Sequence, residues 1–294
     1  MGFQPKKSLV RRKTSSSIEI LCPAKINLYL NIVGKYPRGF HAIESIVNRI
    51  SLCDVLTVTL ADGPDFQMNC TDPSLANDNN LCLRAARLIC RTCGLKQGFR
   101  LDLSKKIPVG AGLGGGSSCA ASTLLAINEL LNLNLSLKTL FDLGAVLGSD
   151  VNFFLSQSSF AFMWGRGEKI KPLDIETRLD YLIVYPGEIL STAKVYQASK
   201  PKLTKFINNV NIILHALKKN DRKLLAWNLY NALEKGAFQV SDCLKKHRSF
   251  FKTEGLAISG SGSAFFKLVS KKERRCALGV KVPGNWGVSL AHSI

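Results

Sequence analysis

The sequence lacks any apolar run long enough to cross a membrane, because none of its hydrophobic stretches reaches the roughly 18 residues that such a helix needs. It also lacks a long apolar segment between the basic residues near its N-terminus and the first expected strand, so no secretory signal is predicted. We therefore expect a cytoplasmic protein without a membrane partner.

Cysteines with paired spacing are missing as well. The nine cysteines are scattered, and Cys90 and Cys93 form a single Cys-x-x-Cys motif with no second pair to complete a zinc site. Others, such as Cys53, Cys82 and Cys119, lie in apolar stretches. This pattern favours free thiols in a reducing compartment over a disulfide framework, and no protein metal site is predicted.

Acidic residues are few relative to basic ones: 21 Asp and Glu stand against 40 Lys and Arg, a formal net charge of +19. Such an excess can indicate nucleic acid, acidic lipid or a polyanionic small substrate as partner. The basic residues are spread from Lys6 to Lys281, and no stripe of them alternates with aromatic residues to form a stacking groove. We therefore expect no nucleic acid partner, and RNA binding is only the second hypothesis.

A chain of 294 residues suggests about two domains. Periodicity predicts strands, then a helix-rich second half, at the following residues: strands at 18–22, 23–33, 43–50, 54–60, 99–107 and 181–185, and helices at 81–92, 119–131, 137–147, 204–218, 221–235 and 239–252. This order predicts an α+β fold with two lobes, which we divide into residues 18–164 and 165–294. Residues 1–17 are basic and are expected to form a disordered lead-in.

The most informative segment is residues 108–118, which read Pro-Val-Gly-Ala-Gly-Leu-Gly-Gly-Gly-Ser-Ser. It lies between the strand expected at 99–107 and the helix expected to begin near Cys119. Its five glycines leave backbone N–H groups unobstructed, and the helix start adds unpaired donors and the positive end of the helix dipole. The segment therefore predicts a site for a phosphate chain.

Known glycine-rich loops can be compared with this segment one by one. A Walker A loop is excluded because no lysine follows the glycines, and the dinucleotide fingerprint at Gly110–Gly115 lacks the acidic residue expected about 20 positions later. A glycine-rich hairpin without a ligand is a third alternative. The segment resembles the phosphate loop of the GHMP kinases, Pro-x-Gly-x-Gly-Leu-Gly-x-x-Ser-Ser, at every defining position.

Three further segments, Pro23–Leu28, Leu147–Phe154 and Ile258–Phe266, resemble GHMP kinase motifs in order and spacing. The resemblance extends from about Ile18 to Ala291. It implies the two-lobed GHMP kinase fold, with the glycine-rich phosphate loop between a strand and a helix. It also implies ATP as phosphoryl donor, with Mg²⁺.

Two segments, Gly112–Ser118 and Arg38–His41, are similar to one branch of this family. That branch phosphorylates the 2-hydroxyl of a methylerythritol linked to cytidine diphosphate, in the non-mevalonate route to isoprenoid precursors. The implied partner is a small-molecule substrate with a cytidine diphosphate moiety, and the implied assembly is a monomer or homodimer. A GHMP kinase acting on mevalonate, homoserine or a sugar is the alternative.

Two residues suit the chemistry of phosphoryl transfer, which needs a proton acceptor and positive charge near the moving phosphoryl group. Lys25 lies inside an otherwise apolar strand, where a lysine is rarely buried without a partner. Asp150 stands at an element boundary before Val-Asn-Phe-Phe, a setting that suits a partly desolvated base. A strand-edge charge and a helix-terminal turn residue are the alternatives for the two positions.

The remaining site residues are implied by the resemblance alone. The ATP-binding set is Pro108, Val109, Gly110, Ala111, Gly112, Leu113, Gly114, Gly115, Gly116, Ser117 and Ser118, together with Asn80, for which a plain helix cap is an equal alternative. The substrate-binding set is Asn27, Phe40, His41, Asp150, Tyr196, Gly260, Ser261 and Gly262, with His41 and the aromatic residues around the cytosine. Three residues of this chain depart from the family pattern. Phe40 stands where tyrosine is common, Asn152 where proline is common, and Cys119 where asparagine or aspartate is frequent.

Overall fold

The computed structural model describes residues 9–36, 40–199 and 207–294. The chain forms two compact units. Unit 1 comprises Met1–Ala24, Cys53–Ile107 and Gly114–Ser158, and unit 2 comprises Lys25–Leu52, Pro108–Leu113 and Ser159–Ile294. This division differs from the linear one expected at residue 164, because two long strands, β2 (Ser17–Lys35) and β3 (His41–Leu60), contribute one part to each unit.

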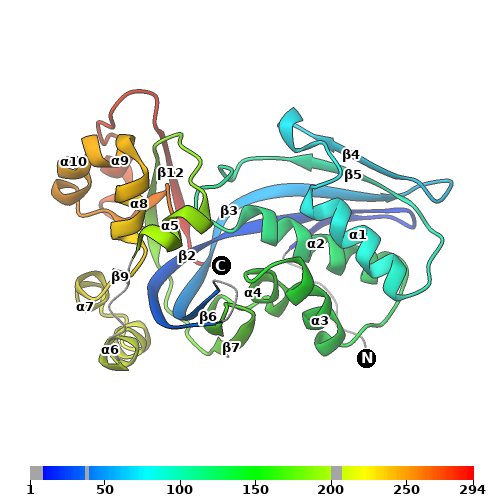
Figure 1. The fold of residues 1–294 in the computed structure, drawn as a ribbon, viewed down its shortest axis with the longest axis horizontal. Coiled ribbons are helices and arrows are strands. Elements are labelled where there is room, and N and C mark those ends of the chain that lie inside the picture. The colour runs from blue at the N-terminus through cyan, green and yellow to red at the C-terminus, as the bar shows by residue number, and fades with distance from the viewer. Residues whose placement is uncertain (1–8, 37–39, 200–206) are drawn as a thin grey trace. The chain divides into compact units, whose positions relative to one another are not determined.

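Unit 1 combines strands with four helices among its described residues. β1 (Val10–Lys13) is antiparallel to the start of β2, the end of β3 is antiparallel to β5 (Phe99–Ser104), and β4 (Phe66–Cys70) runs parallel to β5. The helices are α1 (Leu81–Thr92), α2 (Gly115–Leu130), α3 (Leu137–Leu147) and α4 (Val151–Ser156), and a 3₁₀ turn, η2, spans Pro73–Leu75 (Figure 1). α2 is buried along most of its length because its sequence is nearly all small or apolar.

The expected disordered lead-in is wrong for residues 9–17. Leu9 is buried, and β1 pairs with β2 in an antiparallel register. Charged residues of β1 have partners, since Arg11 pairs with Glu19 at 3.3 Å and Lys13 pairs with Glu129 of α2. The basic composition of this segment therefore did not reveal that part of it forms an edge strand. Residues 1–8 lie outside the described part of the chain.

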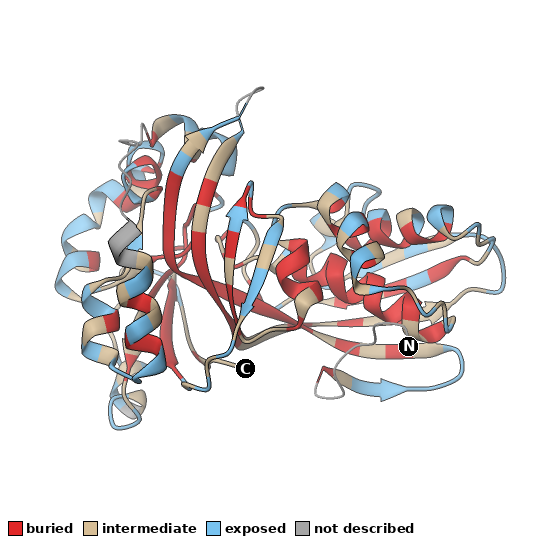
Figure 2. Ribbon diagram, turned by 90° about the horizontal axis from the view of Figure 1, so that it is seen from below, coloured by how far each residue is buried: buried red, intermediate tan, exposed pale blue. Residues whose placement is uncertain are grey.

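Unit 2 contains a four-stranded antiparallel sheet in the order β10-β11-β8-β12. Its strands are Ala257–Ile258 (β10), Phe265–Val269 (β11), Asp180–Tyr185 (β8) and Gly287–His292 (β12). The first part of β3 pairs with β6 (Phe160–Gly165), which pairs with β7 (Lys169–Leu173). Figure 2 shows the long strands buried over much of their length, as their apolar sequence predicts.

The helices of unit 2 are shorter than expected. They are α5 (Thr192–Ala198), α6 (Ile207–Lys218), α7 (Arg222–Trp227), α8 (Glu234–Val240), α9 (Asp242–Lys246), α10 (Arg248–Thr253) and α11 (Arg274–Ala277). The helix expected at 221–235 is interrupted because β9 (Tyr230–Asn231) pairs in parallel with β2 at Tyr29 and Leu30. A tertiary pairing thus overrides the local helical pattern.

The predicted α+β class is confirmed, since helices and strands occur in both units.

All nine cysteines are free thiols. Among the described residues, no helix has the length and apolarity needed to span a membrane. Within that same part of the chain, no cluster of three His, Cys, Asp or Glu side chains could hold a metal ion.

We predict that Leu9→Ala lowers the free energy of unfolding by about 2–5 kcal/mol, the usual effect of truncating a buried leucine. The physical reason is that Leu9, 5% exposed, anchors β1. Urea denaturation followed by circular dichroism measures the change. Val146→Ala is the control, because Val146 is 67% exposed and its truncation should shift the value by less than about 0.5 kcal/mol. Equal effects would show that β1 does not contribute to stability.

Candidate active site

The glycine-rich segment ends at a helix start that has no side-chain cap. Gly114 occupies the N-cap of α2 with φ +73°, a left-handed conformation that suits glycine, and supplies no side-chain oxygen. In contrast, Asn80, Ser136 and Ser191 cap α1, α3 and α5 with side-chain hydrogen bonds. The first N–H groups of α2 are therefore positioned to receive an external anion.

The buried hydroxyl of Ser118 supports the same interpretation. Its Oγ is fully buried in the first turn of α2 and has no hydrogen-bond partner among the residues that the structure describes. Buried hydroxyls in folded proteins nearly always have a partner. A ligand oxygen or a metal ion at the start of α2 would supply one.

Asp150 belongs to the same unit as this helix start. It is partly buried at the N-cap position of α4, and its carboxylate does not cap that helix. An ideal Cβ on Gly148, two residues earlier, would lie 3.7 Å from Ser117 Oγ. The structure thus brings the segment that leads to Asp150 against the first serine of the phosphate loop.

Asn152, one of the departures from the family pattern, has a packing role. It is 4% exposed, and its Oδ1 fills the space that a Cβ on Gly144 of α3 would need. The residue therefore fixes α4 against α3 just after Asp150.

An ion pair between Asp54 and Lys105, which the sequence analysis did not identify, lies next to the phosphate loop. Asp54 of β3 is fully buried, and its carboxylate accepts the Lys105 ammonium at 2.5 Å. It also accepts the backbone N–H groups of Lys106 at 2.7 Å and Ile107 at 2.8 Å, and the Cys119 thiol at 3.4 Å. One carboxylate therefore joins the strand-to-loop corner before Pro108 to the first turns of α2.

Lys105 also lies close to the helix start. An ideal Cβ on Gly115 would be 3.2 Å from Lys105 Nζ and 3.0 Å from Ile107 Cγ2, so only glycine fits there without displacement. Burial lowers the pKa of Lys105, but the electrostatic effect of Cys119 and the ion pair with Asp54 raise it on balance. A cation thus lies beside the loop, although no lysine follows the glycines in sequence.

In unit 2, Lys25 and Asn27 form the start of a buried polar chain. They are 4% and 5% exposed, and Lys25 Nζ donates to Asn27 Oδ1. Asn27 Nδ2 donates to Ser45 Oγ at 2.9 Å, and Ser45 Oγ donates to the Tyr29 carbonyl oxygen at 2.5 Å. These bonds orient the amide with its oxygen toward the lysine.

The segment from Ser259 to Ala264 packs directly against this pair. Gly260 has φ +56°, and an ideal Cβ there would lie 3.3 Å from Lys25 Nζ and 3.4 Å from Asn27 Oδ1. Asn231 of β9 holds the segment by donating to the Gly260 carbonyl at 2.8 Å. Sequence reasoning missed Asn231, because only the pairing of β9 with β2 brings it here.

The first half of the phosphate loop packs on the same segment. Gly112 has φ +76°, and a Cβ there would overlap the Ser259 carbonyl oxygen, so the position requires glycine. Ser259 Oγ donates to the Gly112 carbonyl at 3.1 Å, and Ala264 N donates to the Ala111 carbonyl at 3.0 Å. Three motifs far apart in the sequence therefore meet within unit 2.

Two further residues of the Ser259–Ala264 segment, Ser261 and Gly262, are in close contact with residues outside it. Ser261 is 8% exposed, and its Oγ lies 2.9 Å from Thr192 Oγ1. Gly262 has φ +79° and approaches Ile258 and Leu190 too closely for a side chain.

Tyr185 donates a hydrogen bond from its hydroxyl to the Val109 carbonyl at 3.4 Å, which adds a contact to the loop that begins at Pro108.

His41 and Tyr196 lie together as expected, but in direct contact. Their ring centroids are 5.0 Å apart at an interplanar angle of 30°. A base inserted between them would need about 7 Å, twice the van der Waals contact distance of about 3.5 Å. Burial, with a smaller effect from Lys35, lowers the pKa of His41, so its imidazole is neutral at pH 7.

Phe40 is 52% exposed, and the guanidinium of Arg166 lies 5.2 Å from its ring centroid. Arg166, in the turn after β6, was not identified from sequence. Together the two side chains form an exposed aromatic and cationic surface beside His41. Arg38 and Gly39, which helped to narrow the resemblance, lie outside the described residues.

Asn80 serves as a helix cap, which was one of its two interpretations. Its Oδ1 accepts the Cys82 N–H at 2.8 Å, and its Nδ2 donates to the Leu75 carbonyl at 2.8 Å. The amide oxygen and one amide hydrogen are therefore engaged in ordering the start of α1.

Known proteins share both the motifs and the fold. The family model of the GHMP kinases N terminal domain matches residues 80–158. A 4-diphosphocytidyl-2-C-methyl-D-erythritol kinase of Polynucleobacter asymbioticus is 35% identical over 279 residues, which cover 92% of this chain and 87% of that protein.

Two solved structures extend the comparison. The crystal structure of a 4-(cytidine 5'-diphospho)-2C-methyl-D-erythritol kinase has a TM-score of 0.74 at 33% identity and covers 93% of this chain and 98% of its own. An L. major mevalonate kinase in complex with R-mevalonate has a TM-score of 0.71 at 17% identity, covering 99% and 98%. The second likeness concerns the fold alone.

We predict that Asp54→Asn destabilises the protein by about 3–5 kcal/mol, because it leaves the Lys105 ammonium, with 10% side-chain exposure, without its buried counter-charge. Urea denaturation measures the change. Adding Lys105→Met to the Asp54→Asn variant should recover part of the loss, whereas additive losses would contradict the pairing. Asp102→Asn is the control, since its pair with Arg100 is exposed and should contribute at most about 1 kcal/mol.

Proposed function

Because the chain belongs to the 4-diphosphocytidyl-2-C-methyl-D-erythritol kinase family of the GHMP kinases, we propose that it transfers the γ-phosphate of ATP to the 2-hydroxyl of 4-diphosphocytidyl-2-C-methyl-D-erythritol. The products are the 2-phosphate and ADP, in non-mevalonate isoprenoid precursor biosynthesis. The observation that carries this proposal is the uncapped start of α2 after the glycine-rich loop.

The phosphates of ATP bind the loop of residues 108–118. The N–H groups at the start of α2 receive the anion, and the ammonium of Lys105 beside Gly115 adds positive charge. The closeness of Gly112 to Ser259 holds the loop in the required shape. Asn80 fixes the start of α1 as its cap, and it also contributes to holding the adenine in this proposal.

Mg²⁺ accompanies ATP, and the residues at the helix start fit it. The buried hydroxyl of Ser118, which has no hydrogen-bond partner among the described residues, is a hard oxygen of the kind that Mg²⁺ prefers. When bound, the ion would neutralise negative charge on the phosphates of ATP. Ser118 is the residue that we propose to contact it, whereas Asp150 serves in proton transfer.

The oxygen of the acceptor 2-hydroxyl forms a bond to the γ-phosphorus, and Asp150 accepts the proton that this hydroxyl loses. The bond from that phosphorus to the β,γ-bridging oxygen breaks, and ADP leaves with the electron pair. Lys25 offsets the negative charge that gathers during this transfer. Asn27 holds the lysine through its amide oxygen and is itself fixed by Ser45.

The cytidine end of the acceptor binds near His41. Since His41 and Tyr196 are in contact, the base stacks against this partly buried aromatic pair, next to the exposed Phe40, and not between the two rings. A neutral imidazole offers one donor and one acceptor to the cytosine edge. Arg166 is placed to attract the diphosphate, and Gly260, Ser261 and Gly262 shape the surface near Lys25.

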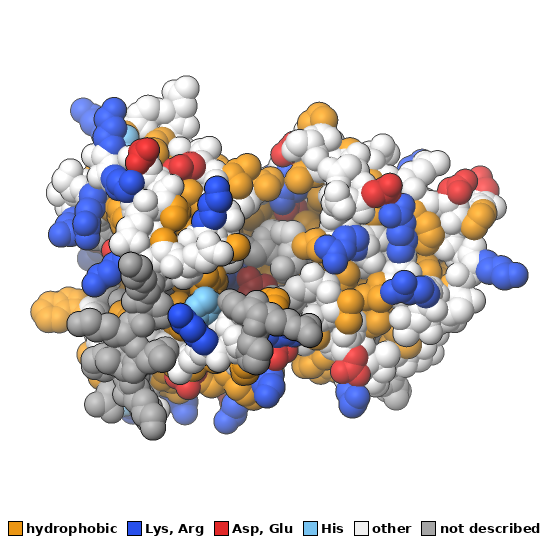
Figure 3. Space-filling model, in the orientation of Figure 1, with side chains coloured by type: hydrophobic (Ala, Val, Ile, Leu, Met, Phe, Trp, Pro, Cys, Tyr) orange, Lys and Arg blue, Asp and Glu red, His pale blue; other side chains and the backbone are white. Residues whose placement is uncertain are grey.

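The net charge of +19 supports this polyanionic pair of substrates better than a nucleic acid. Figure 3 shows Lys and Arg side chains scattered over the visible face and interspersed with carboxylates, not gathered in one band. Free cysteines are typical of a cytoplasmic protein. We propose that the enzyme acts there as a monomer or homodimer, without nucleic acid.

A panel of acceptors tests the function. With labelled ATP, phosphate should pass to 4-diphosphocytidyl-2-C-methyl-D-erythritol far faster than to 2-C-methyl-D-erythritol 4-phosphate, mevalonate or homoserine. Preference for either of the last two would assign the chain to another GHMP activity. Salt-dependent RNA binding without any phosphoryl transfer would favour the second hypothesis.

We predict that Asp150→Asn lowers the single-turnover rate by about 10² to 10⁴, the usual effect of losing a general base. Lys25→Ala should also lower that rate, and the double variant should be scarcely slower than the slower single variant, because both residues serve one step. Binding of ATP should survive in all three. Asp142→Asn, which removes an exposed carboxylate paired with Lys138, is the matched control and should keep the wild-type rate. A rate above about a tenth of wild type for Asp150→Asn would refute its role.

We predict that His41→Ala raises KM for the acceptor by at least about tenfold, the effect of losing about 1.4 kcal/mol of binding, and leaves KM for ATP nearly unchanged. His215→Ala, at an exposed position on α6, should change neither. Because burial lowers the pKa of His41, the neutral form persists at pH 7, and acceptor KM in the wild type should rise only as pH falls below about 6.5. An acceptor KM that does not depend on pH between 5 and 8 would contradict this.

A further inference from the structure

A buried hydroxyl connects the phosphate loop with the strand that carries Lys25. Ser259, the residue after β10, is fully buried, and its Oγ accepts the backbone N–H of Asn27 at 3.3 Å. The same Oγ donates to the Gly112 carbonyl at 3.1 Å. A serine hydroxyl can accept and donate at once, so this one side chain joins the backbone of β2 to the backbone of the loop.

A second connection lies at the next residue of the loop. The Lys25 N–H of β2 donates to the Leu113 carbonyl at 2.9 Å. A single hydrogen bond would leave the loop free to turn about it. Two bonds at neighbouring loop residues, one direct and one through Ser259, fix the orientation of the loop relative to β2 as well as its distance. All of these residues belong to unit 2.

Ser259 is itself held firmly. Its N–H donates to the Ala264 carbonyl at 3.0 Å, and its carbonyl accepts the Gly262 N–H at 3.0 Å. A Cβ on Gly112 would overlap that carbonyl oxygen, so the loop and the serine also touch outside the hydrogen bond. Because the side chain is fully buried, water does not compete for the two partners of its hydroxyl. A displacement of the loop at Gly112 is therefore transmitted to Asn27.

This connection joins two groups whose relative position matters for phosphoryl transfer. On one side is the loop that binds the ATP phosphates in the proposed function. On the other are Lys25 and Asn27, whose side chains form a buried hydrogen-bonded pair. Misplacing a reacting group by about 1 Å can lower a rate by about 10². A firm link between the loop and this pair therefore affects the rate of transfer directly.

We propose that Ser259 is a positioning residue that sets the place of Lys25 relative to the bound nucleotide. It acts through the backbone groups of Asn27 and Gly112 and not by contact with either substrate. This role rests on the proposed kinase function and adds to it a residue that separates catalysis from binding. Loss of the hydroxyl slows the transfer step, while ATP and the acceptor still bind.

Ser259→Ala removes the hydroxyl and tests this role in the full-length protein. At saturating ATP and acceptor, the single-turnover rate should fall at least about tenfold. The Kd values for ATP and for the acceptor, measured separately by titration calorimetry, should each change by less than about threefold. Circular dichroism and urea denaturation check that the variant is folded.

Ser241→Ala is the matched control, because Ser241 is also a fully buried serine of unit 2 whose hydroxyl joins two groups. Its Oγ accepts the Leu244 N–H at 3.0 Å and donates to the Glu188 carboxylate. The variant should lose stability as Ser259→Ala does, but it should keep at least about half of the wild-type rate. A merely structural role of Ser259 would give equal losses of rate.

Two further variants at position 259 vary the hydrogen bonds. Ser259→Thr keeps the hydroxyl and should retain at least about half of the wild-type rate. The thiol of Ser259→Cys is only a weak donor and acceptor, so the rate of this variant should lie between those of Ser259→Ala and the wild type. Ser259→Cys also serves as the test variant if Ser259→Ala does not fold.

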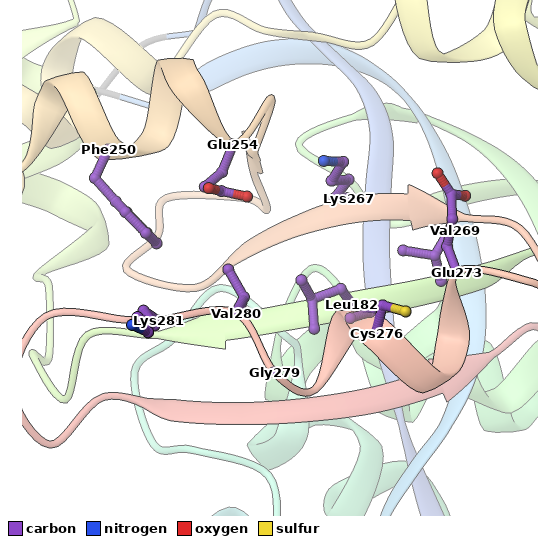
Figure 4. A pocket seen from close by; sticks show the side chains of 11 residues that line it. Leu182, Phe250, Glu254, Lys267, Val269, Glu273, Cys276, Gly279, Val280 and Lys281 are labelled. Carbon is purple, nitrogen blue, oxygen red and sulfur yellow. The ribbon is translucent and has the colours of Figure 1, made fainter.

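A double-mutant cycle shows whether Ser259 acts through Lys25. In a Lys25→Ala background, Ser259→Ala should lower the rate by less than about threefold more, because the group that it positions is gone. The charge control is Lys281→Ala, which removes a positive charge at the lining of a cavity of about 500 Å³ beside β8 and β11 (Figure 4). Neither Asn27 nor Gly112 lines that cavity. In this second background, Ser259→Ala should show its full loss.

Three results would each overturn the role of Ser259: a loss below about tenfold in folded Ser259→Ala, an equal loss in Ser241→Ala, or the full loss again in the Lys25→Ala background. A Ser259→Thr variant as slow as Ser259→Ala would do the same. Absence of transfer by the wild type to any acceptor would instead overturn the proposed function, and the role of Ser259 with it.

Discussion

The buried carboxylate of Asp54 in unit 1 is the contact on which the phosphate loop, residues 108–118, depends. Its four donors come from Lys105, Lys106, Ile107 and Cys119, which lie on both sides of the loop in sequence. A loop with five glycines has little conformational preference of its own, because each glycine adds backbone entropy that folding must overcome. Fixing both ends of the loop to one buried charge limits that freedom.

The same arrangement answers a difficulty that the sequence raised. No lysine follows the glycines, yet the strand before the loop places an ammonium next to Gly115. Its pairing with Asp54 makes it tolerable in a buried setting, since a lone buried ammonium would be strongly disfavoured. The fold thus supplies near α2 a charge that other phosphate loops carry within their own sequence.

In unit 2, a second set of contacts holds a buried lysine. Lys25 is oriented by Asn27, which is oriented by Ser45, while Gly260 allows the backbone of a distant loop to approach the pair. Asn231 secures that loop from β9. The side-chain polar atoms of Lys25, Asn27, Ser45 and Asn231 each have a hydrogen-bond partner, and a satisfied buried polar network confers rigidity.

The sequence by itself determined the fold class, the family and the main motifs, because glycine patterns and strand or helix periodicity are local properties. It also indicated Lys25 and Asp150, since a lysine in an apolar strand is conspicuous. It could not reveal β1, the break in the helix at 221–235, or the roles of Asp54, Lys105 and Asn231, which depend on partners far away in the chain. Only the tertiary structure decided that Asn80 is engaged as a cap and that His41 contacts Tyr196 directly, because packing, not residue type, determines which hydrogen-bonding groups and ring faces are left for a ligand.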